Sequence, residues 1–207
     1  MRILLSYVLA FGLVPIVGKA SLAQSFFVAP QINASLSIGT AQDYATPKVG
    51  YGAKIGYQVI NRWSIIAGYD TYRFNVDAPV GRLSNIASIL SLLDLPDVLP
   101  IDMNTQVWNA GFRYAIPYQG IVPFIGLSAS TNSLDVEVLG LSVSRRYWGV
   151  APIIGIELPL ANRWSLQADT RVQTIFIRGD IPFVDDVVKE HLVFIPIQTG
   201  VVFYISK

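Results

Sequence analysis

The sequence predicts an all-β protein: an eight-stranded antiparallel up-and-down transmembrane β-barrel with one short helix in an outer loop. Apolar and polar side chains alternate along many short segments, which is the period of a β-strand. The connections between these segments alternate between short and long. Of the 207 residues 52% are hydrophobic and 14% charged, yet after the first two dozen no apolar run has the ~20 residues of a spanning helix.

Eight segments carry the alternation, each close to the length that a tilted strand needs to cross a bilayer. In the first of them, Ile32 and Leu36 alternate with Asn33 and Ser35. The predicted strands lie at about 31–38, 50–59, 63–72, 108–116, 121–129, 145–158, 166–176 and 193–205. Four of them contain a proline, which removes a hydrogen-bond donor, so we expect bulges or strand ends near Pro30, Pro123, Pro152 and Pro196.

The connections predict which strand ends lie together. Short turns are expected at Asn61-Arg62, Pro117–Gln119 and Ala161–Arg163, and long loops at Gly39–Lys48, Asn75–Met103, Thr131–Leu141 and Gly179–Glu190. Short and long connections at opposite ends are typical of a membrane barrel. The tetrapeptide Asn-Arg-Trp-Ser occurs twice, at Asn61–Ser64 and Asn162–Ser165, and two matched hairpins account for it.

The first 23 residues have the pattern of a cleavable signal peptide. Arg2 is followed by an apolar stretch from Ile3 to Val17, and Ser21 and Ala23 place small residues before the expected cleavage site. We therefore expect an exported protein whose barrel domain comprises residues 24–207.

Alternation alone does not decide which face is outside, because a soluble lipocalin-like barrel has its apolar face inward. Two features favour a membrane. The large apolar side chains would overfill an eight-stranded interior. Aromatic residues also gather near the segment ends, as the girdles at two membrane interfaces do. The predicted girdle residues are Trp63, Tyr69, Trp108, Tyr114, Trp148, Trp164 and Phe203.

With these features, the chain resembles the small OmpA/OmpX/opacity-type, porin-like outer-membrane barrels of Gram-negative bacteria. The sharpest local match is the last strand, Gln198–Ile205, which resembles the C-terminal signal for barrel assembly through Gln198, Gly200, Phe203 and Ile205. The chain departs from the family by continuing to Ser206 and Lys207. The resemblance implies the outer membrane as location, with its lipid and lipopolysaccharide, the barrel-assembly machinery and a surface ligand or host protein as partners.

Charged residues on the polar faces are expected to line the barrel interior. They are Lys54, Asp70, Arg113, Arg145, Glu157, Asp169 and Arg171. Because buried charges persist only when they are paired, they are expected to form a salt-bridge plug, with a narrow or gated pore as the alternative.

The Asn75–Met103 loop has its own apolar pattern at helical spacing, which predicts the outer helix. That helix would cover the barrel mouth or contact a partner. Its apolar residues are Leu83, Ile86, Ile89, Leu90 and Leu93.

No catalytic, cofactor or metal site is predicted. The chain has no cysteine and one histidine, and its net charge of +1 does not call for nucleic acid. Lipid A deacylases and palmitoyl transferases share the barrel architecture and use a histidine beside a serine, but the residue two after His191 is Val193. We expect a non-enzymatic protein that serves envelope integrity and surface interaction through its long loops. A narrow channel for small or hydrophobic solutes is the first alternative, and a lipid A-modifying enzyme the second.

Overall fold

The computed structural model describes residues 25–38, 45–60, 62–79, 98–116, 118–138, 141–177 and 191–205. The described residues form strands and turns, and none of their segments is a helix that could cross a membrane. The predicted signal peptide and the predicted outer helix at Leu83–Leu93 lie outside these ranges. The strands are β1 (Phe26–Ile38), β2 (Ala45–Ile60), β3 (Trp63–Pro79), β4 (Val98–Ala115), β5 (Val122–Val138), β6 (Leu141–Ala161), β7 (Trp164–Arg171), β8 (Gln173–Phe176) and β9 (His191–Tyr204).

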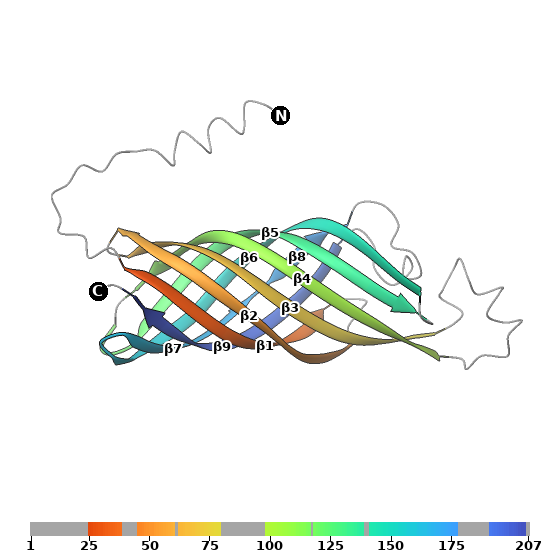
Figure 1. The fold of residues 1–207 in the computed structure, drawn as a ribbon, viewed down its shortest axis with the longest axis horizontal. Coiled ribbons are helices and arrows are strands. Elements are labelled where there is room, and N and C mark those ends of the chain that lie inside the picture. The colour runs from red at the N-terminus through yellow and green to blue at the C-terminus, as the bar shows by residue number, and fades with distance from the viewer. Residues whose placement is uncertain are drawn as a thin grey trace, which may run out of the picture.

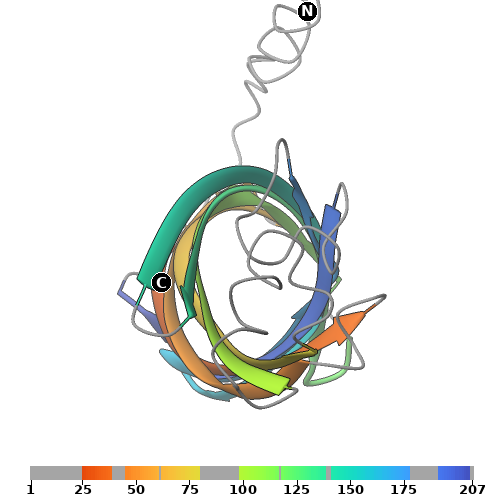
Figure 2. The ribbon, with the colours of Figure 1, turned by 90° about the vertical axis from the view of Figure 1, so that its right-hand side faces the viewer.

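The strands form one antiparallel up-and-down sheet, in which β1 to β6 each pair with the next strand along the chain. Only Val172 separates β7 from β8, and both lie between β6 and β9, so the nine segments fill eight positions. The first and last strands also pair, from Phe27 opposite Tyr204 to Ile38 opposite Val193. Viewed along its length, the sheet curves around a central axis (Figure 2). The all-β, antiparallel up-and-down prediction is confirmed.

The two faces of the sheet differ in polarity in the sense that a membrane requires. On β1, Ile32 and Leu36 are 56% and 52% exposed, whereas the alternating Asn33 and Ser35 are buried. The same holds on the other strands, because the outward side chains in the middle of the sheet are mostly isoleucine, leucine and aromatic residues, while many of the buried side chains are polar or charged. The apolar set therefore faces outward, opposite to a lipocalin-like barrel.

The β2–β3, β4–β5 and β6–β7 turns lie at one end of the barrel, which we call the turn end (Figure 1). Strand β1 begins there and β9 ends there. At the opposite end, β3 and β4 pair as far as Pro79 and Val98, and β5 and β6 as far as Val138 and Leu141.

The extent predicted for three loops is therefore wrong, since the end of the predicted loop Gly39–Lys48 lies in β2 and the other two overlap β3 to β6. Asn75 and Met103 lie within β3 and β4, and the predicted loop Thr131–Leu141 is mostly strand. The reason is a reversal of polarity between the two faces: near these strand ends the apolar Phe74 and Met103 point inward and are buried, while the charged Arg73 and Asp102 face outward and are exposed. A prediction that expects apolar residues on the outward face therefore assigns these strand ends to loops.

The prolines lie where pairing is interrupted or a strand begins. Pro123 is the second residue of β5, and Pro152 and Pro196 flank the break at Val172 on β6 and β9. At that break the Val172 N–H still donates to the Pro152 carbonyl at 3.2 Å. The Thr170 hydroxyl donates to the Pro196 carbonyl at 3.0 Å, which replaces part of the missing ladder.

Candidate functional site in the barrel interior

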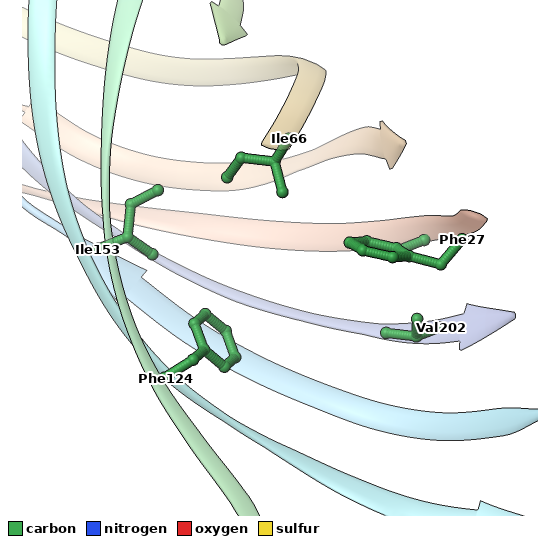
Figure 3. Close-up of a cluster of buried hydrophobic side chains, with 6 residues drawn as sticks. Phe27, Ile66, Phe124, Ile153 and Val202 are labelled. Carbon is green, nitrogen blue, oxygen red and sulfur yellow. The ribbon is translucent and has the colours of Figure 1, made fainter. Parts of the chain in front are cut away.

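The turn end of the interior is filled by apolar side chains. Phe27, Ile66, Phe124, Ile153 and Val202 are each at most 4% exposed and come from five different strands. They converge in the interior (Figure 3). This cluster closes the turn end with packed carbon atoms, because an eight-stranded barrel is narrow enough for side chains to fill.

Next to this cluster lies an ion pair, which we call the turn-side pair. Arg113 Nη2 is 3.2 Å from Glu157 Oε2, and both side chains are buried. The guanidinium also lies over the rings of Phe27 and Phe124, at 4.5 and 5.1 Å from their centroids. Tyr204 donates its hydroxyl proton to Glu157. The pair is therefore held by two aromatic faces as well as by its own charges.

A larger group, which we call the central network, crosses the interior toward the other end. Lys54 Nζ lies 2.8 Å from Asp169 Oδ2, and Arg171 Nη2 lies 3.2 Å from Asp70 Oδ2. Gln198 joins the two pairs, because its carbonyl oxygen accepts from Lys54 and Arg171 while its amide donates to Asp70. Two positive and two negative charges thus meet with no net charge.

Neutral side chains complete the network. Tyr72 accepts a hydrogen bond from Gln198 at 2.9 Å, and Asn109 and Gln31 donate to Asp70. Gln167 accepts from Arg113 and donates to Asp169, so it connects the turn-side pair to the central network. Because these charges are removed from water, each depends on these partners for its solvation.

Six of the seven charged residues predicted for the interior lie there, and they form these two groups. Arg145 does not, and its assignment is corrected. It lies three residues beyond Trp148 toward the loop end of β6, opposite Leu134, and is exposed. Its position has the inward phase, but its side chain is exposed even though Leu134 opposite is buried.

The residues that sequence reasoning missed are amides and a phenol, above all Gln198 and Tyr72. The available signal was phase: Gln198 alternates with the outward Ile197 and Thr199 in the same way that Asp169 alternates with its neighbours. A neutral side chain at an inward position among buried charges has to be one of their partners.

Beyond the central network the interior changes character. Buried side-chain atoms of Asn33, Ser35, Thr105 and Gln173 have no hydrogen-bond partner among the described residues, as is also true of Asn109 Oδ1, Arg113 Nε, and Arg171 Nε and Nη1 in the two ionic groups. Farther out the interior is apolar, with Phe194 packed edge-on against Tyr72 and Phe74 at ring centroid distances of 5.0 and 5.7 Å. The loop half of the interior therefore leaves polar groups that ordered water would satisfy.

The predicted girdle residues lie near both ends of the apolar belt. Toward the turn end, Trp63 packs on Tyr114 at 5.0 Å between ring centroids, and Trp164 on Phe203 at 4.6 Å. Toward the loop end, Tyr69 packs on Trp108 at 4.8 Å. Trp148 is 72% exposed and lies opposite Phe176. Such rings have an apolar body and a polar edge, which suits them to a membrane interface.

Strands β3 to β6 continue past Tyr69, Trp108, Thr131 and Trp148, and we call the part beyond these residues the outer extension. Its outward face carries charges of both signs. Lys48, at the same level on β2, forms an ion pair with Asp102 at 3.3 Å. The other exposed charged side chains on this face are Arg73, Glu137 and Arg146, and Arg145 is exposed at a position of the opposite phase.

The structure also places His191 and the residues of the predicted assembly signal. His191 is exposed at the start of β9, opposite Phe176. No group of three or more metal-ligating side chains occurs within the described part of the chain. Of the predicted assembly signal, Gln198 belongs to the central network, Gly200 lies opposite Gln31 of β1, and Ile205 is half exposed at the turn end.

Comparison with known proteins gives one family match and several solved structures with a similar fold. Residues 9–190 match the family model of the outer membrane protein beta-barrel domain. No curated protein matches the chain.

Among solved structures, neisserial surface protein A is 16% identical, with a TM-score of 0.57 over 86% of this chain and 96% of that one. OprG from Pseudomonas aeruginosa is 14% identical, with a TM-score of 0.56 over 89% and 97%. Ail, the attachment invasion locus protein of Yersinia pestis in complex with the heparin analogue sucrose octasulfate, is 12% identical, with a TM-score of 0.51 over 88% and 99%. These likenesses show the fold.

Proposed function

This chain belongs to the outer membrane protein beta-barrel domain family and lies in the outer membrane of a Gram-negative bacterium, and from that premise we propose that it is a non-enzymatic surface protein. Its barrel, closed through β1 and β9, anchors the outer extension and the loops, which make the contacts outside the cell. The barrel itself contributes to envelope integrity.

The observation that carries this proposal is the filled interior. A packed apolar cluster and two connected ionic groups cross the barrel from β1 to β9, and their charges cancel. Moving an ion past them requires breaking buried pairs, each of which costs several kcal/mol when one partner is left alone. The exposed outer extension is then the part of the described chain that is free to meet a partner.

The mixed charges of the outer extension bear on the kind of partner. Ail was solved with a heparin analogue, which is a polyanion. Here Lys48, Arg73, Arg145 and Arg146 are accompanied by Asp102 and Glu137, so the described surface presents charges of both signs and suits a protein ligand with complementary acidic and basic side chains.

Conductance tests the proposal directly. The full chain is reconstituted into planar bilayers, and we expect no steady current above that of protein-free bilayers. Steady single-channel steps of the unaltered protein would support the narrow-channel alternative instead. That alternative is favoured by one observation, the unpartnered polar atoms of Asn33, Ser35 and Thr105 in the loop half of the interior.

A second test addresses the surface role and barrel closure. In cells lacking the protein, full-length chain is compared with a variant in which residues 76–101 are replaced by a two-residue hairpin turn. Both are expected to run more compactly on gels before boiling and to restore detergent resistance. Only the full-length protein is expected to support adhesion to surfaces coated with laminin, with heparin as the polyanion control. Equal adhesion by both would overturn the surface role of this hairpin.

A further inference from the structure

The repeated Asn-Arg-Trp-Ser tetrapeptide forms two turns of the same construction. In each, the arginine carbonyl accepts a backbone N–H from the neighbouring strand: Ala115 donates to Arg62, and Tyr204 to Arg163. The tryptophan that follows packs on an aromatic ring of that strand, Tyr114 in the first turn and Phe203 in the second. The sequence repeat is thus a structural repeat at the turn end.

The two turns lie on opposite sides of the barrel. One joins β2 to β3 and the other β6 to β7, which places them four strand positions apart in a ring of eight. Both tryptophans face outward at the same end, since Trp63 is 43% and Trp164 49% exposed. Their arginines therefore lie at the same membrane interface, and each turn is a natural control for the other.

The first turn has an apolar groove beside it. The groove has a volume of about 450 Å³ and runs over the outer face of β3, β4 and β5. One wall is aromatic and the other aliphatic, with the backbone of Gly126 between them. It is lined by Trp63, Phe112, Tyr114, Ile125, Gly126 and Leu127. A groove of this composition on a membrane-facing surface suits a hydrocarbon chain.

A polar pair lies at the interfacial end of this groove. Arg62 Nη1 donates to the Tyr114 hydroxyl oxygen at 3.2 Å. Because that oxygen accepts from the guanidinium, the hydroxyl proton remains to be donated outward, together with the other guanidinium protons. No carboxylate within the described part of the chain pairs with Arg62. A cation and a hydroxyl donor thus face the headgroup level without an internal counter-ion.

We propose that this groove binds one acyl chain of a phospholipid in the periplasmic leaflet, and that Arg62 and Tyr114 bind its phosphate. Short turns of outer-membrane barrels face the periplasm, so the groove opens into that leaflet. Phosphate accepts charge-assisted hydrogen bonds from a guanidinium, and the chain occupies the apolar groove.

Native mass spectrometry of the full chain in detergent tests the proposal. The probes are dipalmitoyl phosphatidylglycerol and the diacylglycerol with the same two chains, which lacks the phosphate. The unaltered protein is expected to retain one phosphatidylglycerol and to bind the diacylglycerol at least five-fold more weakly, as expected for one arginine acting on a lipid phosphate at about 1 kcal/mol. Arg62→Gln is expected to lower phosphatidylglycerol affinity about five-fold.

The second turn supplies the matched control. Arg163→Gln is expected to leave phosphatidylglycerol binding unchanged, because Phe203 has no hydroxyl to share a phosphate. Tyr114→Phe makes the first turn like the second, with an expected loss of about three-fold for one hydrogen bond. Equal retention by Arg62→Gln and the unaltered protein, equal losses for the two arginine variants, or equal binding of diacylglycerol would each overturn the proposal.

Discussion

The turn-side pair and the central network hold the same kind of charges inside the same barrel, but they are supported differently. Arg113 has Glu157, two aromatic faces and Gln167 around it. Lys54 has Asp169 and Gln198, and Gln198 also bonds to Arg171 and to its partner Asp70. In the first group the two aromatic faces are independent supports of the cation, whereas in the second the Gln198 amide is shared among three charged side chains.

Because partners in the central network are shared, a single substitution there affects more than one charged side chain. In the central network, loss of one carboxylate leaves a lysine uncompensated and also alters the solvation of Arg171. In the turn-side pair, loss of the carboxylate charge leaves the guanidinium on the rings of Phe27 and Phe124. The comparison predicts that equal changes of charge have unequal costs, depending on how many partners each ion shares.

The largest effect is expected for Asp169→Ala. It leaves Lys54, which is 4% exposed, without its carboxylate. We expect the free energy of unfolding to fall by about 3–5 kcal/mol, as for other buried pairs that lose one member. The measurement is urea unfolding of the full chain in lipid vesicles, followed by tryptophan fluorescence.

The control for this prediction is the double variant Lys54→Met with Asp169→Leu. It removes both charges and keeps the volume, so most of the lost stability is expected to return. If the double variant were as unstable as Asp169→Ala, packing rather than the unpaired charge would explain the loss.

A smaller effect is expected for Glu157→Gln in the turn-side pair. The amide retains the shape and can still accept from Tyr204 and Arg113, while the rings continue to hold the guanidinium. We expect a loss of about 1–2 kcal/mol in the same unfolding experiment. A loss as large as that of Asp169→Ala would contradict the distinction between independent and shared supports.

On the outer face, the same reasoning separates Trp63 from Trp148. Trp63 packs on both Tyr114 and Phe112, whereas Trp148 is 72% exposed. Replacement by alanine should cost about 1 kcal/mol more at Trp63 than at Trp148, the value of an aromatic pair beyond its area. Equal losses in vesicles would show that lipid contact, not ring packing, determines the contribution of the girdle.

The smallest effect is expected for Lys48→Ala in the outer extension. Its ion pair with Asp102 is solvent-exposed, so water and salt already screen it. We expect a change of at most about 1 kcal/mol, which should vanish at molar salt. A large change that persists in salt would place this pair with the buried groups.

The membrane-facing part of the fold could be predicted from the sequence because lipid on one side and polar partners on the other impose a strict alternation. Ile32 and Asn33 show it at neighbouring positions. The outer extension could not be predicted in the same way, since several of its outward side chains are charged and several of its inward ones are apolar. Leu134 and Val136 therefore read as loop residues although they are buried in β5.

The interior could be predicted in its charges but not in its connections. A charge at an inward position has to find a partner, which is why Lys54 and Asp169 could be assigned to the interior from phase alone. Which charges meet depends on strand register and tilt around the ring, and Gln198 carries no charge to reveal its role. Arg145 shows the converse, because its position has the inward phase and its side chain is nevertheless exposed.

The central network also bears on the order of folding. Lys54 contacts Asp169 and Gln198 across 115 and 144 residues of chain, and Gln198 reaches Asp70 across 128. Bringing such distant residues together costs loop-closure entropy before any contact repays it. The network can therefore form only after β9 has reached β1 and β7. Until then four charged side chains remain hydrated, and their desolvation is postponed to the final step of barrel closure.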